Sequence, residues 1–180
     1  MTSKLERRIL DALLGKPLVT NAFRGMMVEA MLAEVLEPDW RWCGADWASH
    51  DFENAAGVRL EVKQSAALQS WHGERARPNP GRFDIAARKM RWEGTIKVEE
   101  GGRAAAIYVF AWHPECDAAK ADHRDPAQWE FHIVPASALP PRKTLGLAAV
   151  RKLAGSVKID AVAGEVAAVL RNLEPGSSPG

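Results

Sequence analysis

The spacing of hydrophobic residues predicts helices at both ends of the chain. Hydrophobic residues recur every three or four positions from Lys4 to Leu14 and again from Asn21 to Leu36, which is the period of a helix. The second helix is apolar on most sides, so it is expected to be buried. Its polar exceptions are Arg24, Glu29 and Glu34. Two closing helices are expected at 145–153 and 159–170.

Between these helices the pattern changes to short β-prone stretches separated by turn residues. Strands are expected at 41–43, at about 50–53 and at 58–65, with a hairpin connection from Asn54 to Gly57. Segment 69–79 is polar and is predicted to be a loop, and 82–86 is a candidate short strand. The run AAAIYVFAW at 104–112 is typical of a strand covered on both faces. Segment 129–134 alternates, which indicates a further strand.

The order of these elements predicts an α/β fold in which a central mixed sheet is flanked by helices. A chain of 180 residues suits one domain, expected over 1–174, with a disordered tail at 175–180. No apolar run is long enough to span a membrane and no signal peptide is recognisable, so a cytoplasmic protein without a membrane partner is expected. Cys43 and Cys116 are expected to be free thiols.

Positive charge is concentrated in one segment of a nearly neutral chain. The net charge is +1, yet the segment from Val58 to Arg91 holds eight basic and three acidic residues, a local net charge of +5. Such a concentration favours a polyanionic partner, although basic runs are often only solvated surfaces.

The most informative motif lies on the strand predicted at 58–65. Side chains alternate between the two faces of a strand, so Glu61 and Lys63 share one face while Leu60 and Val62 share the other. If the hairpin forms, Asp51 lies across from Glu61. Two carboxylates and an ammonium group would then converge at one end of the sheet.

This set of groups suits the hydrolysis of a phosphodiester bond. The carboxylates of Asp51 and Glu61 and the main-chain carbonyl of Val62 are oxygen ligands of the kind that Mg²⁺ prefers, and Mn²⁺ can substitute. Lys63 can position the attacking water and stabilise developing charge. An acid and a base two residues apart on a strand are also commonly an exposed ion pair of little energetic consequence.

The arrangement D-x₉-E-x-K on hairpin-linked strands, preceded by a helix that bears an acid, resembles the PD-(D/E)xK restriction-endonuclease-like superfamily. The resemblance implies an αβββαβ core and cleavage of nucleic acid with a divalent metal. It assigns the two acidic positions to Asp51 and Glu61 and the lysine to Lys63. It also implies catalytic roles for Glu29, as the additional acid on the helix, and for Gln64. The proline that often precedes the first acid is missing.

A closer resemblance covers most of the domain, from about Trp47 to Pro135. The strings SHDFENAAGVRLEVKQSAALQSW, AAAIYVFAWHP and DPAQWEFHIVP are similar to those of a family of uncharacterised bacterial proteins with a D-x₉-EVK-x-SAxLQSW pattern. This likeness implies the same core and supplies no substrate.

Several residues after the lysine are candidates for contact with nucleic acid. Ser65, Gln69, Trp71 and His72 can contact phosphate or stack on a base, or Trp71 can pack under the loop while Gln69 bonds to the backbone. The basic residues expected to hold the phosphate backbone are Arg75, Arg77, Arg82, Arg88, Lys89 and Arg91.

Other candidate residues have simpler interpretations. Asp46 is an alternative to Asp51 as the first acid, and Glu29 can equally be a buried acid paired with Arg24 or a main-chain amide. His113, Glu115, Cys116, Asp122 and His123 have metal-ligand side chains without a recognised zinc spacing. Trp112, Trp129, Phe131 and His132 are expected in or near the core.

Together these patterns predict a Mg²⁺-dependent nuclease that hydrolyses phosphodiester bonds, most simply in DNA. A protein of the same fold that binds nucleic acid without cutting it is the alternative. A third interpretation is a subunit of a larger defence or phage-related assembly. A homodimer would suit cleavage of both strands of a duplex.

Overall fold

The computed structural model describes residues 2–44, 48–71, 77–87 and 101–173, together with the backbone of 91–93 and 96–98. The tail expected at 175–180 lies outside these residues. Within them, no helix is both long and apolar enough to cross a lipid bilayer.

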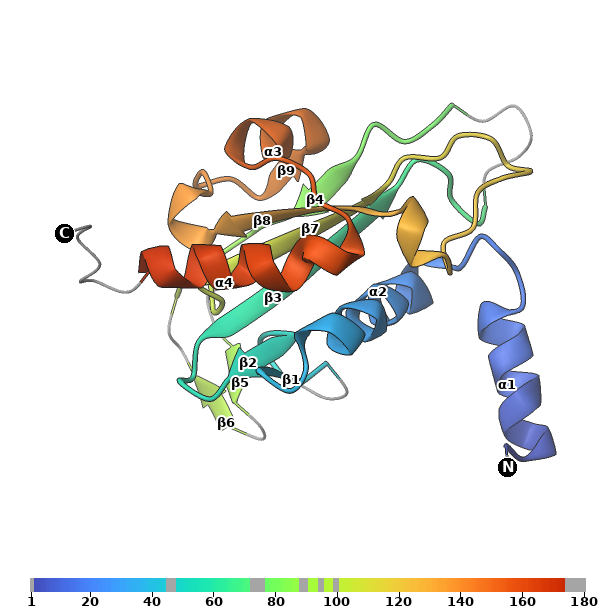
Figure 1. Cartoon of the computed structure of the whole chain (residues 1–180), viewed down its shortest axis with the longest axis horizontal. Coiled ribbons are helices and arrows are strands. Elements are labelled where there is room, and N and C mark those ends of the chain that lie inside the picture. The colour runs from blue at the N-terminus through green and yellow to red at the C-terminus, as the bar shows by residue number, and fades with distance from the viewer. Residues whose placement is uncertain are drawn as a thin grey trace.

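Five strands form the central sheet, in the spatial order β1-β2-β3-β7-β8 (Figure 1). Strands β3 and β7 are parallel, whereas the other neighbouring pairs are antiparallel. The expected mixed sheet is therefore confirmed. The strands are β1 (Trp40–Trp42), β2 (Phe52–Asn54), β3 (Arg59–Ala66), β7 (Ile107–His113) and β8 (Glu130–Pro135).

Two helices cover one face of this sheet (Figure 1). They are α2 (Asn21–Leu36), which precedes β1, and α4 (Val162–Leu173), which follows a short 3₁₀ turn, η3 (Ile159–Ala161). Val28 and Leu32 from α2 and Val162 from α4 are fully buried, and they belong to the same core as Leu60 of β3. The long apolar stretches of the two helices thus account for their position.

The opposite face is covered by α3 (Leu147–Leu153) and a small two-stranded sheet, β4 (Arg82–Asp84) with β9 (Thr144–Gly146). Phe83 of β4 meets Phe110 of β7 edge to face, with ring centroids 5.1 Å apart. Because both faces of the sheet are covered, all seven residues of β7 are buried, which explains its nearly continuous apolar run. The remaining 3₁₀ turns are η1 (Pro126–Gln128) and η2 (Ala136–Ala138).

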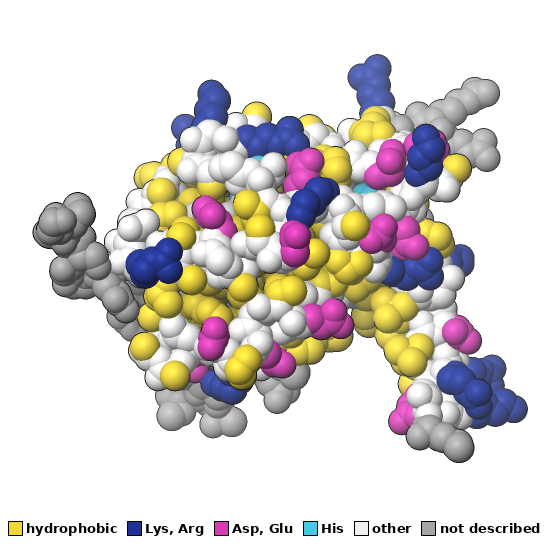
Figure 2. All heavy atoms as spheres, viewed as in Figure 1, with side chains coloured by type: hydrophobic (Ala, Val, Ile, Leu, Met, Phe, Trp, Pro, Cys, Tyr) yellow, Lys and Arg dark blue, Asp and Glu magenta, His cyan; other side chains and the backbone are white. Residues whose placement is uncertain are grey.

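Helix α1 (Lys4–Leu14) projects from the body of the molecule (Figure 1). Its first turn is closed by a capping box, in which Ser3 Oγ accepts from the Glu6 amide at 3.1 Å and the Glu6 carboxylate bonds to the Ser3 amide. None of its eleven residues, all of them described, is buried. Figure 2 shows apolar side chains of α1 on the side turned toward the body.

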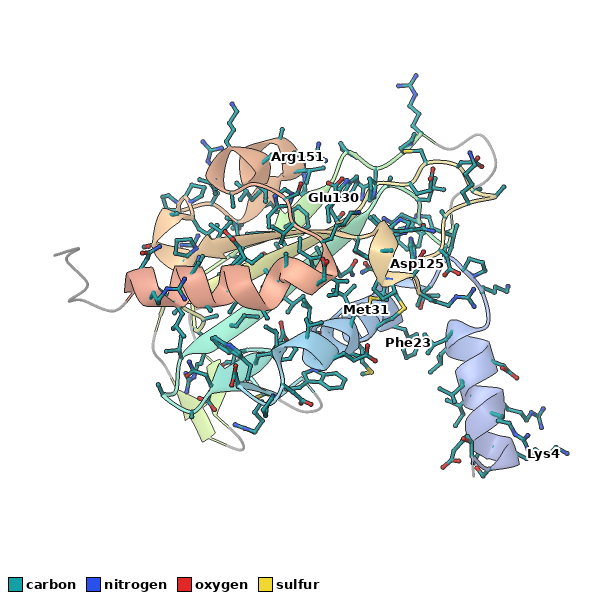
Figure 3. All side chains as sticks on the ribbon, viewed as in Figure 1. Lys4, Phe23, Met31, Asp125, Glu130 and Arg151 are labelled. Atoms are coloured by element: carbon teal, nitrogen blue, oxygen red, sulfur yellow. The ribbon has the colours of Figure 1, made fainter. Side chains whose placement is uncertain are left out.

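The structure corrects part of the expectation for α2. Phe23 and Met26 are 37% and 53% exposed, whereas Arg24, expected as a polar exception, is 1% exposed. Phe23 lies near the N-terminal end of α2 (Figure 3), whereas Met31, about two turns further along the helix, is buried in the core. The sheet covers only one side of this end of the helix, so apolar residues on the other side stay open.

The chain between β3 and β7 also differs from the αβββαβ order. In its described part the crossover contains no helix and instead forms β4 and a hairpin of β5 (Arg91–Glu93) with β6 (Ile96–Val98). Strand β9 was not expected either, because segment 145–153 was assigned wholly to a helix. Leu145 pairs with Phe83 of β4, which delays the start of α3 to Leu147.

Candidate active site

The site begins where β2 and β3 separate. Asp51 directly precedes β2, and its amide donates to the Leu60 carbonyl at 3.0 Å. Its side chain then takes the place of a main-chain acceptor opposite β3, because Oδ2 accepts from the Val62 amide at 2.6 Å. A strand residue's amide and carbonyl point to the same side, so the Val62 carbonyl also faces this opening.

Strand β3 supplies the acid and base of the site. Leu60 and Val62 are buried among the residues under α2 and α4, so Glu61 and Lys63 point to the opposite face. The Lys63 ammonium donates to Glu61 Oε1 in an ion pair, and the two side chains are 24% and 19% exposed. The alternation predicted from the sequence places these groups together, partly shielded from water.

Asp51 is electrostatically strained in this position. Burial raises the pKa of its carboxyl to about 8, and the neighbouring carboxylates of Glu61 and Glu29 act in the same direction. The Val62 amide and the Lys63 ammonium oppose this rise. Three acids therefore lie close enough to repel one another, an arrangement that a cation would stabilise.

Glu29 approaches this group from α2. Its Oε2 accepts from the Trp42 indole at 3.0 Å, and burial raises its pKa, with repulsion from Glu61 in the same direction. Gly44 makes this position possible, because a Cβ there would collide with the Glu29 carboxylate. The partner of Glu29 is therefore the Trp42 indole, and not Arg24 or a main-chain amide as the sequence suggested.

The donor set fits a hard divalent cation. Asp51 Oδ1 and Glu61 Oε2 are the carboxylate oxygens that take no part in the contacts described above, and the Val62 carbonyl faces the same opening. Carboxylate and carbonyl oxygens are the ligands that Mg²⁺ and Mn²⁺ prefer. Asp51, Glu61 and Val62 would hold such an ion, and Glu29 lies close enough to add to its negative environment.

A cavity of about 490 Å³ opens beside Lys63. It lies between the N-terminal end of α2, the C-terminal half of β3 and β4. Among the described residues of its wall, the basic ones are Arg24, Lys63 and Arg82 and the acidic one is Asp84. Six residues expected to bind nucleic acid or to act in catalysis lie in its wall: Lys63, Gln64, Ser65, Gln69, Trp71 and Arg82.

Arg24 is the least expected member of this wall. It is 1% exposed, and its described partners are neutral amides, namely Gln64 at 2.6 Å, Gln69 at 2.9 Å and Asn21 at 2.8 Å. Burial lowers the pKa of its guanidinium to about 10, so it remains charged at neutral pH. A buried cation held by amides gives the cavity a fixed positive charge that suits an anion.

The predicted polar residues after the lysine have clear places. Gln64 lies on the α2 side and accepts from Arg24, so it is apart from the Asp51–Glu61 pair. Gln69 bonds to the Ala66 carbonyl at 2.7 Å as well as to Arg24, and Ser65 Oγ accepts from Asn79 at 3.2 Å. Trp71 is 66% exposed at the cavity, which does not favour the alternative in which it packs under the loop, whereas the bond from Gln69 to the backbone agrees with that alternative.

Other predicted residues lie away from the cavity or outside the described part of the chain. Arg77 is exposed and is not part of the cavity wall. His72, Arg75, Arg88, Lys89 and the alternative acid Asp46 lie outside the described residues, as does the side chain of Arg91.

The histidines of the second half have structural positions. His113 and His123 are fully buried, with ring centroids 4.8 Å apart, and both pack against Trp129. His123 Nδ1 accepts from the Val19 amide at 3.1 Å. His132 is buried beside the Ala154 and Gly155 carbonyls, and Trp112, Trp129 and Phe131 are buried as expected. Cys43 and Cys116 are free thiols.

Sequence reasoning missed Arg24, Asn21 and Asn79 as cavity residues. An arginine within an otherwise apolar helix was a signal for Arg24, but its amide partners come from distant parts of the chain.

No family model matches the sequence, and no match is found among the curated proteins.

Proposed function

We propose that this chain is a metal-dependent nuclease of the PD-(D/E)xK restriction-endonuclease-like type that hydrolyses phosphodiester bonds in DNA. The observation that carries the proposal is the position of Asp51, whose carboxylate bonds to the Val62 amide beside the Glu61–Lys63 pair. Two carboxylates, a main-chain carbonyl and a lysine then face one opening at the edge of β3.

The arrangement of the sheet supports the same assignment. Helix α2 is followed by the antiparallel β1-β2-β3 meander and then by β7, parallel to β3. This order agrees with the first four elements of an αβββαβ core and with the strand that follows its crossover. The short strands in place of a crossover helix would be a variation of that core.

The chemistry follows from the groups in the site. A bound Mg²⁺ or Mn²⁺ would lower the pKa of a coordinated water and polarise the phosphate. Asp51 and Glu61 would hold that ion beside the phosphate. Lys63 orients the attacking water and stabilises the negative charge that develops on the phosphate oxygens. Water forms a new bond to phosphorus, and the bond to one sugar oxygen breaks.

The cavity beside Lys63 is suited to the phosphate backbone on one side of the cut. Arg24 and Arg82 supply positive charge there, and exposed Trp71 offers a flat ring on which an unpaired base can stack. The same cavity also favours the alternative function, a protein that binds DNA through this wall without cutting it.

The test is cleavage of supercoiled plasmid DNA with Mg²⁺ and with Mn²⁺. We expect nicking by the wild type and at least about a hundredfold slower nicking by Glu61→Gln and Lys63→Met, because each removes a group that acts in the transition state. Glu130→Gln is the matched control. Glu130 lies away from the site and forms an ion pair with Arg151, with a distance of 2.9 Å between the two charged groups (Figure 3). It should cut at the wild-type rate.

Full activity of purified Glu61→Gln would contradict the nuclease proposal. If the wild type does not cut, fluorescence anisotropy with labelled DNA in EDTA tests the non-cutting alternative. That alternative expects metal-independent binding that weakens in Arg82→Gln and falls steeply as salt increases.

A further inference from the structure

A second group of metal-ligand side chains lies at the open end of β1 and β2. Cys43 follows β1, His50 precedes Asp51, and Glu53 lies within β2. One ligand atom from each, a thiol sulfur, an imidazole nitrogen and a carboxylate oxygen, lies within 4.8 Å of the others. We propose that Cys43, His50 and Glu53 bind a zinc-class cation, at a site separate from the one formed by Asp51 and Glu61.

The three donor atoms are the set that zinc takes in proteins. Zinc binds thiolate sulfur at about 2.3 Å and imidazole nitrogen or carboxylate oxygen at about 2.0–2.2 Å, in tetrahedral geometry. Tetrahedral ligands with these bond lengths lie roughly 3.3 to 3.8 Å apart. Side-chain rotations that bring the atoms closer by roughly 1 Å would therefore complete three corners of the tetrahedron, and water would fill the fourth.

The backbone around these residues is already fixed by hydrogen bonds. The Cys43 amide donates to the Asp51 carbonyl at 2.7 Å, which aligns the end of β1 with the residue after His50. Glu53 is held by its register with Arg41. Glu53 therefore lies within a paired strand and Cys43 and His50 lie beside the ends of the pair, so that binding requires adjustment of side chains rather than refolding.

The present partners of Cys43 and Glu53 can be exchanged for a metal. Cys43 Sγ donates to the Arg41 carbonyl at 3.3 Å, a weak thiol bond that is lost when the thiol releases its proton to solvent on metal binding. Glu53 Oε2 lies 2.9 Å from Arg41, whereas Oε1 lies 3.5 Å from Arg59. The latter distance is longer than a normal hydrogen bond, so Oε1 is the oxygen that a metal would engage.

This site would act on the neighbouring one through the backbone. His50 is bonded directly to Asp51 in the chain, and Cys43 holds the Asp51 carbonyl. A cation bound by both Cys43 and His50 would link the end of β1 to the residue before Asp51, and it would thereby restrain Asp51. The proposal does not depend on nuclease activity, because two of the three ligands, a thiolate and an imidazole, are ones that Mg²⁺ does not favour.

The test is a titration of the purified protein with Co²⁺, a spectroscopic substitute for zinc, followed by displacement with Zn²⁺. We expect a thiolate-to-cobalt charge-transfer band in the near ultraviolet with tetrahedral visible bands, and the loss of both on adding Zn²⁺. Cys43→Ser should abolish the charge-transfer band. His50→Gln should weaken cobalt binding by at least about tenfold, since even indirect ligand partners contribute that much.

Two controls distinguish this site from others. Cys116→Ser removes the other free thiol, which is exposed, and should leave the band intact. Glu61→Gln alters the Asp51–Glu61 site and should also leave it intact, whatever the outcome of the cleavage assay. No band in the wild type, a band that persists in Cys43→Ser, or its loss in Glu61→Gln would overturn the proposal. Far-ultraviolet circular dichroism establishes that each variant is folded.

Discussion

At the scale of single residues, Asp51 shows a conflict between stability and chemistry. Burial raises the pKa of its carboxyl to about 8, and the charges of Glu61 and Glu29 act in the same direction. Selection for stability alone would not place a third acid beside Glu61 and Glu29. The hydrogen bond from the Val62 amide fixes its direction, so the repulsion is concentrated where a cation would bind.

Asp51→Asn tests this conflict directly. The amide oxygen of Asn can still accept from Val62, and Asn does not have to take up a proton on folding, so the cost of burying an acid beside Glu61 and Glu29 disappears. Without metal, we expect the free energy of unfolding in urea to rise by on the order of 1 kcal/mol at neutral pH. The increase in melting temperature on adding Mn²⁺ should be lost. A variant that is clearly less stable than the wild type without metal would contradict the electrostatic argument.

The residue-level predictions from the sequence succeeded where a simple period decides the outcome. Alternation along β3 puts Glu61 and Lys63 on one face and Leu60 and Val62 on the other, and a short hairpin brings Asp51 opposite them. The burial of Arg24 could not be predicted in the same way. It depends on Gln64 and Gln69, which lie 40 and 45 residues away in the sequence.

At the scale of elements, the predictable ones are those with their own periodic pattern. Both N-terminal helices have the bounds expected from their apolar spacing, and the buried run at β7 was recognised as a strand. Strand β9 has only three residues and is a strand because β4 lies beside it. Such short strands are defined by their partners and leave almost no signal in sequence.

The segment between β7 and β8 fastens elements that the sequence pattern does not connect. His123 accepts from the Val19 amide, just before α2, and its own amide donates to the Pro17 carbonyl at 2.9 Å. Its ring packs against His113 of β7 and Trp129. The N-terminal end of α2, which carries Arg24, is thereby held against the sheet by a neutral imidazole.

This contact predicts a loss of stability in acid. Burial, Arg24 and His113 lower the pKa of His123 to about 4, whereas the unfolded chain titrates near 6.5, so protons favour the unfolded state. The stabilisation is fully present above about pH 6.5 and declines as the pH falls toward about 4. Between about pH 7 and about pH 5, we expect His123 to account for a loss of about 2 kcal/mol.

Urea unfolding of the wild type and of His123→Gln at both pH values measures this contribution. Glutamine keeps a hydrogen-bond acceptor but does not titrate, so the variant should show a smaller loss between the two conditions. His113, whose pKa burial also lowers, leaves a remainder in both proteins. Equal losses in the wild type and the variant would mean that His123 is not the titrating group.

At the scale of the whole molecule, two parts contribute very differently to stability. The sheet with α2, α3 and α4 holds the buried side chains, whereas no side chain of α1 is buried. Helix α1 is tied to the body at its C-terminal end, where Arg124 donates to the Leu14 carbonyl at 3.0 Å. Its capping box stabilises its first turn locally.

Substitutions in the two parts should therefore differ sharply. Ile9 is 47% exposed on α1, and Ile9→Glu should change the free energy of unfolding by no more than about 0.5 kcal/mol. Leu32 is fully buried between α2 and the sheet, and Leu32→Ala should cost about 2–5 kcal/mol, because it removes buried methyl groups and leaves a cavity. Urea denaturation of dilute protein measures both. A cost for Ile9→Glu close to that of Leu32→Ala would instead indicate that α1 packs against a partner surface. A charge buried in such an interface is destabilising, whereas an exposed charge is not.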